Sequence, residues 1–221
     1  MYSALITGGS RGIGRAIKEL FESRGLKVYT PSSQQCNLAN PQSIAAYTAT
    51  LPRVDILINC AGINKLAYLE EADDALIQEM FQVNMFATMQ LIKAVVPQMK
   101  QNNYGRIVNF SSIWCRFSKN ARVVYSSAKA SVSGLSMALG VELSPYGILT
   151  NAIAPGFINT EMTAINNAPP PNRIYQRIFT DKKARRAYGS SRAGVFFKRE
   201  KYLYNRTNDF YRWRIFLCIK N

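Results

Sequence analysis

The sequence predicts an α/β protein in which a parallel sheet lies between two layers of helices. Short apolar runs alternate with segments of helical periodicity along most of the chain. The apolar runs are nearly continuous, as in parallel strands that are buried on both faces. At 221 residues, with 48% hydrophobic side chains, the chain is long enough to bury a core. We therefore expect a three-layer αβα sandwich.

The predicted elements follow one another from the N-terminus. Residues 4–7 form an apolar run that glycines follow, and residues 15–24 place apolar side chains at helical spacing before Gly25. The further predicted strands are 26–30, 54–59, 106–110 and the run that begins at 148. The further predicted helices are 41–51, 71–100 and 126–143. Asn40 is the expected N-cap of the second helix, with Pro41 at its first position.

The amino-acid composition excludes several kinds of catalytic site. The chain has no histidine, which excludes Ser-His-Asp catalysis, Cys-His catalysis and histidine-based zinc sites. Its four cysteines stand far apart without a CxxC pair, so we expect buried thiols, a reducing cytoplasm and no metal site. No apolar run reaches membrane-spanning length, and the first residues enter a strand, so we expect neither a membrane anchor nor a signal peptide.

The stretch TGGSRGIG at residues 7–14 directly follows the first predicted strand and opens the first predicted helix. Gly8, Gly12 and Gly14 permit a tight turn in which the backbone comes close to a pyrophosphate, and the helix N-terminus supplies N–H groups. Because the strand-turn-helix context is right, we favour a dinucleotide site over a merely structural glycine turn.

The adenosine end of that site carries no carboxylate. NAD sites often have an Asp or Glu at the end of the second strand. Here the strand runs into Pro31, Ser32 and Ser33 instead. With Arg11 in the glycine loop, these hydroxyls suit a 2′-phosphate, so we predict NADP(H), with NAD(H) as the alternative. The competing interpretation of Arg11 is a solvated surface cation.

The stretch YSSAK places Tyr125 and Lys129 four residues apart, on one face of a helix. A free tyrosine has a pKa of about 10. An adjacent ammonium favours the phenolate and lowers that pKa. In a chain without histidine, this pair is the natural acid/base for a carbonyl or an alcohol.

Six motifs, in order, resemble those of the short-chain dehydrogenase/reductase family. They are TGGSRGIG, NCAG at 59–62, VN at 83–84, the serine thirteen residues before Tyr125, YSSAK and APGFINTEM. Cys60 stands where the family's NNAG motif has its second asparagine. The resemblance covers about residues 3–162 and is strongest for 3-oxoacyl-(acyl carrier protein) reductases and related sugar or polyol reductases. It implies a Rossmann-like fold and an NAD(P)H-dependent oxidoreductase that interconverts a carbonyl and a secondary alcohol.

The resemblance also implies roles for individual residues. Tyr125 is then the general acid/base, Lys129 lowers its pKa and binds the nicotinamide ribose, and Ser112 polarises the substrate carbonyl. Asn84 orders a water that passes protons to Lys129. The implied cofactor-binding residues, besides Tyr125 and Lys129, are Gly8, Ser10, Arg11, Gly12, Ile13, Gly14, Asn37, Leu38, Asn59, Ala61, Gly62, Pro155, Gly156, Ile158 and Thr160.

The substrate is less well determined by the sequence. The implied substrate residues are Ser112, Trp114, Tyr125 and Phe157. Trp114 and Phe117 could stack on an apolar or ring substrate. Arg116, Lys119 and Arg122 either meet an acidic carrier or a phosphate, or belong to a solvated loop. The short connection between Tyr29 and Asn37 lacks the helix that many relatives have there. The resemblance further implies a homotetramer or homodimer.

The α/β rhythm stops at NNAPPPN, residues 166–172. We therefore predict a nucleotide-binding and catalytic domain at 1–165 and an atypical tail at 166–221. Segment 181–221 has 12 Lys and Arg against 3 Asp and Glu, so it carries +9 of the chain's net +15. Such a basic tail, interleaved with aromatic residues, is one signature of nucleic-acid binding.

A second interpretation of the tail is an out-of-frame translation. When codons are read one base later from Lys201, permitted choices spell NTYITGQTIFIDGG, which is like the last strand of the family. We favour this hypothesis over nucleic-acid binding, with the shift between about Met162 and Gly194. It makes the last strand missing or non-native and predicts weak or no activity. The alternatives are therefore an impaired, truncated nucleotide-binding product, or a reductase with a nucleic-acid-binding tail.

Overall fold

The computed structural model describes residues 1–156 and 158. A five-stranded parallel sheet in the order β2-β1-β3-β4-β5 forms the centre of this part. The strands are β1 (Ser3–Thr7), β2 (Lys27–Tyr29), β3 (Ile56–Asn59), β4 (Gly105–Phe110) and β5 (Ile148–Ile153). The chain runs outward from β1 to β2 and then returns past β1 to β3. Ligands of such sheets bind at this switch point, at the carboxyl ends of the strands.

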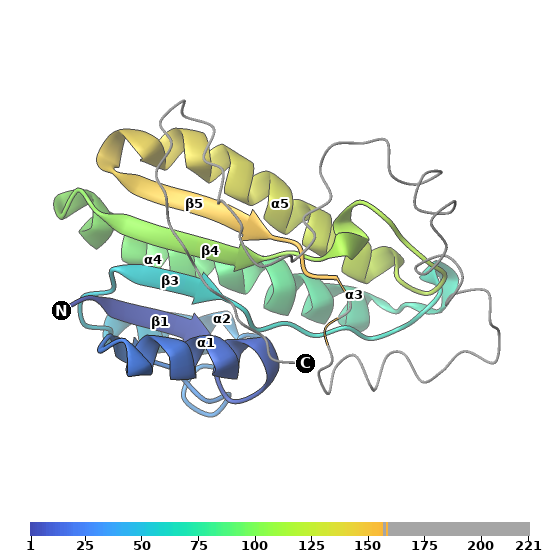
Figure 1. The fold of residues 1–221 in the computed structure, drawn as a ribbon. Coiled ribbons are helices and arrows are strands. Elements are labelled where there is room, and N and C mark those ends of the chain that lie inside the picture. Colours follow the sequence, from blue (N-terminus) through green and yellow to red (C-terminus); the bar gives the residue numbers. More distant parts are fainter. Residues whose placement is uncertain (157, 159–221) are drawn as a thin grey trace.

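Helices cover both faces of the sheet. They are α1 (Gly12–Ser23), α2 (Pro41–Ala49), α3 (Asp74–Phe81), α4 (Ala87–Gln101) and α5 (Val123–Leu143). Figure 1 shows α1 in front of the sheet and α4 behind it. The predicted Rossmann-like three-layer sandwich is therefore confirmed. The predicted last strand and the boundary at residue 165 lie outside the described residues.

Alternating side chains of the central strands build two cores. Leu5, Leu57 and Ile107 pack with apolar residues of α2, α4 and α5. Their neighbours Ile6 and Ile58 turn to the opposite face and pack against α1. This alternation is the period-2 geometry of strands, and burial on both faces explains why the runs contain so few polar residues.

The predicted helix over 71–100 is interrupted in the structure. A short 3-10 helix η1 (Leu69–Glu71) precedes α3, and a π-helical turn η2 (Gln82–Phe86) separates α3 from α4. Such turns widen a helix by one residue and occur often at functional sites. This one contains Asn84, which is 1% exposed.

Two helix starts also differ from the sequence prediction. Helix α1 begins at Gly12 rather than at residue 15, so the glycine loop runs directly into its first turn. Helix α5 begins at Val123 rather than at residue 126, and the Ser126 N–H donates to the carbonyl of Arg122. The Asn40 cap of α2 is confirmed, because its side chain accepts hydrogen bonds from two N–H groups of the first turn.

The remaining described helices are the 3-10 turns η3 (Ile113–Cys115) and η4 (Ser144–Tyr146). Within the described residues, no helix combines the length and apolar character needed to cross a membrane.

Candidate active site

The glycine loop between β1 and α1 leaves no room for side chains. A Cβ on Gly14 would lie 2.2 Å from the carbonyl oxygen of Gly8. Gly8 has a φ of +71°, and its Cβ would lie 3.0 Å from the backbone N of Ala61. The loop therefore brings bare backbone and the N-terminus of a 12-residue helix to one place. This geometry fits a dinucleotide pyrophosphate.

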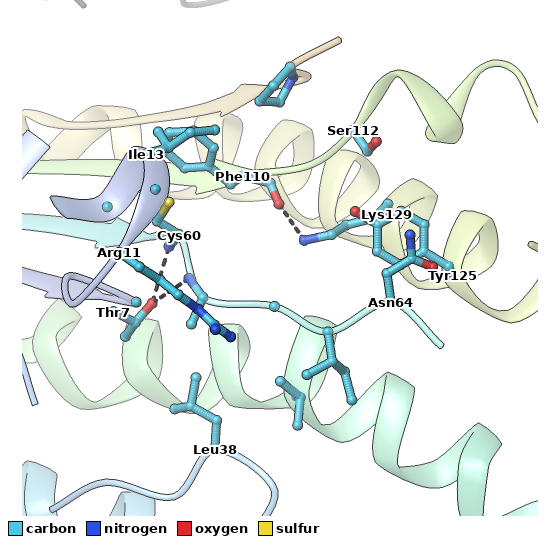
Figure 2. Close-up of a pocket in the computed structure, with 18 of the residues that line it drawn as sticks. Thr7, Arg11, Ile13, Leu38, Cys60, Asn64, Phe110, Ser112, Tyr125 and Lys129 are labelled. Atoms are coloured by element: carbon cyan, nitrogen blue, oxygen red, sulfur yellow. Dashed lines mark hydrogen bonds between the residues drawn. The ribbon is translucent and has the colours of Figure 1, made fainter. Parts of the chain in front are cut away.

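Thr7, at the end of β1, ties the glycine loop to the NCAG segment. Its Oγ1 accepts hydrogen bonds from the backbone N–H groups of Cys60 and Ala61, both at 3.1 Å. Figure 2 shows both bonds on the left of the site. Sequence analysis did not single out Thr7, although it opens the glycine motif.

The adenosine side of the site is built by the segment after β2. Ser32, Ser33, Asn37 and Leu38 line it. The Asn37 side chain accepts a hydrogen bond from the backbone N of Ala39 at 3.0 Å, which turns the segment toward α2. Figure 2 shows Leu38 below the side chain of Arg11. A cofactor that spans from β1 to this segment is therefore bordered by serine hydroxyls and a guanidinium.

Asn59 lies differently from its predicted cofactor-binding role. Its side chain is buried between the strands and donates to Asn109 at 2.8 Å, and Asn109 in turn donates to Ser136 of α5 at 2.9 Å. Asn59 is not one of the described residues that line the cavity. Its amide nitrogen instead connects β3 to β4, and Asn109 continues the connection to α5.

The catalytic side lies at the carboxyl end of β4 and on α5. The side chains of Ser112 and Tyr125 both line the cavity, and the Ser112 hydroxyl lowers the pKa of the Tyr125 phenol. The Lys129 Nζ lies 5.8 Å from the centroid of the Tyr125 ring and donates to the carbonyl oxygen of Phe110 at 2.8 Å. Figure 2 shows Lys129 reaching toward Phe110 with Tyr125 beside it. The structure thus brings three of the four predicted catalytic residues, Ser112, Tyr125 and Lys129, to one cavity.

Burial shifts the pKa values of Tyr125 and Lys129. It raises the pKa of Tyr125 above its ordinary value, and the nearby Ser112 hydroxyl and Arg122 guanidinium offset that rise only in part. The sequence predicted a lowered pKa, but the Lys129 ammonium is engaged by a backbone carbonyl instead. Burial also lowers the pKa of Lys129 to about 8, and it raises the pKa of Cys60 to about 12, so Cys60 stays a thiol.

The Asn84 side chain is hydrogen bonded to the backbone of Ile63, a residue that lines the cavity. Its side chain accepts from the N–H of Ile63 at 3.2 Å and donates to the carbonyl of Ile63 at 2.9 Å. A Cβ on Gly62 would lie 2.7 Å from the Asn84 Oδ1 and 3.3 Å from the Lys129 Nζ. Asn84 and Lys129 are therefore neighbours across a glycine, and the water between them stays a prediction.

The cofactor side and the catalytic side share one cavity of about 660 Å³. Thr160 and Phe157 lie outside the described residues. The predicted residues that line the cavity are Gly8, Ser10, Arg11, Gly12, Ile13, Gly14, Asn37, Leu38, Ala61, Gly62, Ser112, Trp114, Tyr125, Lys129, Pro155, Gly156 and Ile158. Lining residues that the predicted set omitted include Thr7, Cys60, Phe110 and Ser111. The Phe110 contribution is a backbone carbonyl, which no residue pattern signals.

The family model described as short chain dehydrogenase matches residues 32–170. The chain belongs to the short-chain dehydrogenase family. It is 34% identical over 182 residues to the 3-oxoacyl-(acyl-carrier-protein) reductase FabG of Escherichia coli (strain K12), covering 72% of this chain and 75% of the relative. It is 33% identical over 184 residues to the short-chain reductase protein NovJ of Streptomyces niveus, covering 72% of this chain and 70% of that relative.

Solved structures agree with the family assignment. One short chain dehydrogenase/reductase family protein superposes with a TM-score of 0.73 at 28% identity, over 76% of this chain and 79% of the other. A putative NAD(P) dependent gluconate 5-dehydrogenase from Beutenbergia cavernae, solved with bound NADP, has a TM-score of 0.66 at 28% identity, over 76% and 77% of the two chains. The relatives and the solved structures therefore agree that this chain belongs to a family of oxidoreductases.

Proposed function

We propose that this chain catalyses the NADP(H)-dependent interconversion of a carbonyl compound and a secondary alcohol through Ser112, Tyr125, Lys129 and Asn84. The observation that carries the proposal is that Ser112, Tyr125 and Lys129 line one cavity, with the buried amine of Lys129 one helical turn beyond Tyr125. When bound, the nicotinamide supplies or accepts the hydride.

The protein's own residues supply and direct the proton. The raised pKa of Tyr125 keeps its phenol protonated near neutral pH, so the phenol can donate to the oxygen of a carbonyl. The Ser112 hydroxyl binds the same oxygen and fixes its position. The charge of Arg122 favours the phenolate that remains. Asn84 holds residue 63 and so keeps the wall opposite Lys129 in place.

The simplest test is consumption of NADPH with a panel of carbonyl compounds. We expect a fall in absorbance at the NADPH band that requires both substrates and is lost in a Ser112→Ala, Tyr125→Phe double variant. No turnover across oxoacyl thioesters, ketones and oxo acids, with NADPH bound, would contradict the proposal and favour an impaired nucleotide-binding protein.

The preference for NADP(H) over NAD(H) rests on Arg11, Ser32 and Ser33. All three line the cavity, and no carboxylate from the segment after β2 joins them there. We expect kcat/KM to favour NADPH over NADH in the wild-type protein, and Arg11→Ala to remove most of that preference. Near-equal turnover of the two cofactors by the wild-type protein would overturn it.

Two substrate classes compete within this proposal. Relatives named as 3-oxoacyl-(acyl-carrier-protein) reductases favour acyl-carrier-bound substrates, and hence a role in fatty acid biosynthesis. Solved structures named as putative gluconate dehydrogenases favour small sugar acids or polyols. Comparing a 3-oxoacyl thioester with a sugar acid as substrates of the same preparation separates the two.

We further propose a homotetramer or homodimer in the cytoplasm. Exposed apolar side chains on α4 and α5 support self-association, among them Met89, Met137 and Val141. Size-exclusion chromatography with light scattering tests the oligomer, and a monomer at all concentrations would contradict it.

Within this proposal, the activity of the chain depends on its tail at residues 166–221. The out-of-frame hypothesis predicts that one inserted or deleted base between the codons of Met162 and Gly194 restores an ending like that of the family. We expect the gene repaired in this way to give a more active protein than the 221-residue chain. Stop codons in the shifted frame would contradict the hypothesis. Salt-sensitive RNA binding lost on truncation at residue 181 would favour the nucleic-acid-binding tail instead.

A further inference from the structure

The segment that builds the adenosine side of the cavity has little regular structure of its own. Residues 30–40 connect β2 to α2 through turns, without a helix or a strand. Short-range hydrogen bonds shape these turns: the N–H groups of Gln35 and Cys36 both donate to the Ser32 carbonyl, at 3.1 and 2.9 Å. Such bonds shape a turn but do not fix it relative to the rest of the protein. The position of the segment therefore depends on contacts with other elements.

Gln82 makes such a contact from the other end of the sequence. Its Nε2 donates to the backbone carbonyl of Leu38 at 3.0 Å, across 44 positions of the chain. Leu38 lines the cavity on the adenosine side, and its side chain packs against the core cluster that contains Leu5. Gln82 is not one of the described residues that line the cavity. Any effect of Gln82 on a bound cofactor therefore passes through another residue.

The backbone of Gln82 is well anchored. Gln82 is the first residue of the π turn η2, and its N–H donates to two carbonyls of α3. The next residue, Val83, lines the cavity, and Asn84 is hydrogen bonded to the backbone of Ile63. One turn of the chain thus contacts the adenosine segment through Gln82 and the Ile63 wall through Asn84.

The side-chain amide of Gln82 has two acceptors around it. Besides the Leu38 carbonyl, its Nε2 lies 3.4 Å from the Oε1 of Gln90 on α4. An amide nitrogen carries two N–H groups and can donate to both. The bond to Leu38 has an ordinary length, whereas the contact with Gln90 is long. Two acceptors on the same side orient the amide, so that its nitrogen faces the Leu38 carbonyl.

We propose that Gln82 is a positioning residue for the cofactor, because it holds the Leu38 peptide and with it the segment that receives the adenosine half of NADP(H). This inference rests on the proposed function and adds a residue to its cofactor site. A segment that is already ordered loses less conformational entropy when the cofactor binds, which raises the affinity. The effect should be confined to the adenosine half, since Figure 2 shows Leu38 well apart from Tyr125 and Lys129.

The test divides the cofactor into two fragments. Adenosine 2′,5′-bisphosphate stands for the adenosine half and nicotinamide mononucleotide for the other half, and calorimetric titration gives a Kd for each. Gln82→Met keeps a side chain of similar length without a donor. We expect it to raise the Kd for the bisphosphate about 2- to 12-fold, the range for one lost neutral hydrogen bond, and the Kd for the mononucleotide by less than about 2-fold. Equal weakening of both fragments, or of neither, would overturn the proposal.

Gln82→Glu is a second variant, of the same length, that tests the donor directly. An ionised carboxylate offers only acceptors, so it cannot bond to the Leu38 carbonyl. We expect it to weaken binding of the bisphosphate at least as much as Gln82→Met. Wild-type affinity for the bisphosphate in Gln82→Glu would show that the bond does not matter.

Gln98→Met is the matched control. Gln98 is a half-buried residue of α4, and its Oε1 accepts from the backbone N–H of Val54 at 3.2 Å, also across 44 positions. Val54 precedes β3, at the amino ends of the strands and outside the cavity lining. Gln98→Met should therefore lower the melting temperature about as much as Gln82→Met and leave the affinity for both fragments unchanged. A comparable loss of bisphosphate affinity would indicate general loosening and overturn the proposal.

A comparison of the two dinucleotides separates the role of Gln82 from that of Arg11. NADPH and NADH share the adenosine and differ in the 2′-phosphate. Gln82→Met should raise the Kd for both by a similar factor, whereas Arg11→Ala should change their ratio. A loss confined to NADPH would assign Gln82 to the 2′-phosphate and contradict a role in positioning the segment.

The binding measurements also distinguish failure of this inference from failure of the proposed function. Wild-type protein that binds the fragments but reduces no carbonyl compound would contradict the proposed reductase. A selective loss of bisphosphate affinity in Gln82→Met would still support the positioning role. Conversely, an active reductase whose bisphosphate affinity is unchanged in both Gln82 variants would overturn this inference alone. Wild-type protein that binds neither fragment would overturn the cofactor site and this inference together.

Discussion

The cofactor side and the catalytic side of the cavity are built by opposite means. On the cofactor side the shape comes from missing atoms: Gly8 and Gly14 allow backbone to approach backbone where a Cβ would collide. On the catalytic side the shape comes from the buried side chains of Ser112, Tyr125 and Lys129, with the Lys129 amine held by the carbonyl of Phe110. The cofactor side should therefore be sensitive to one added carbon, and the catalytic side to one removed heteroatom.

Removing one oxygen from the catalytic side should have the largest effect. Tyr125→Phe deletes only the phenolic oxygen, which carries the transferred proton in the proposed mechanism. Loss of a general acid typically lowers the rate about 10²- to 10⁴-fold. We expect kcat to fall in that range while the Kd for NADPH, measured by fluorescence titration, changes by less than about 3-fold. An equal loss of NADPH binding would show that the two sides are not separable.

Adding one carbon to the cofactor side is expected to have the next largest effect. In Gly14→Ala the new Cβ would meet the carbonyl oxygen of Gly8 at 2.2 Å, so the loop must move. Overpacking of this kind costs about 1–3 kcal/mol, which predicts a Kd for NADPH raised about 5- to 150-fold. Gly134→Ala is the control, because nothing lies within 4 Å of its Cβ on α5. Unchanged NADPH affinity in Gly14→Ala would contradict the proposal that the glycine loop binds the pyrophosphate of the cofactor.

The buried amine of Lys129 predicts a pH dependence of stability. Its pKa of about 8 in the folded chain lies below the ordinary value of 10.5. Between these values the unfolded state binds more protons, so this group makes the free energy of unfolding rise with pH, by at most about 3 kcal/mol. Below pH 8 both states are protonated and the contribution is constant.

Denaturant unfolding from pH 7 to 10.5 checks that sign. The free energy of unfolding of the wild type minus that of Lys129→Met should increase through the window. Lys93→Met, at an exposed position of α4, should leave the wild-type slope unchanged. A flat difference for Lys129→Met would mean that the amine is more hydrated than the structure indicates.

The smallest expected effect concerns the polar chain behind the catalytic side. Ser136→Ala removes the acceptor of the Asn109 side chain, which is fully buried. An unsatisfied buried donor costs about 1–3 kcal/mol, so the unfolding midpoint should fall without a change in KM. Ser131→Ala, which loses only an exposed bond to the Ser127 carbonyl, should stay near the wild type.

Local patterns predicted most of the site. The three glycines, the strand before them and the helix after them are contiguous, so one stretch of sequence predicts the glycine loop. Tyr125 and Lys129 share a helical face through their spacing alone. The parallel sheet and the burial of its apolar runs likewise followed from the alternation of short apolar and helical segments.

Non-local contacts explain what the sequence did not predict. Asn59 belongs to a motif that suggests cofactor binding, but strand pairing places it beside Asn109. Helix α5 begins at Val123, although valine has a low helix propensity, and Val124 in its first turn is buried against Met80. The pKa of Tyr125 depends on burial and on Arg122, neither of which the spacing of YSSAK specifies.

The π turn between α3 and α4 makes chain length itself a functional property. Residues 82–86 hold one residue more than an α-helical turn needs, and the surplus lets Asn84 reach the backbone of Ile63. Deleting one residue there would merge the two helices and rotate one against the other by about 100°. A sequence with every motif intact could therefore still lose the reaction, through a shortening that substitution experiments never sample.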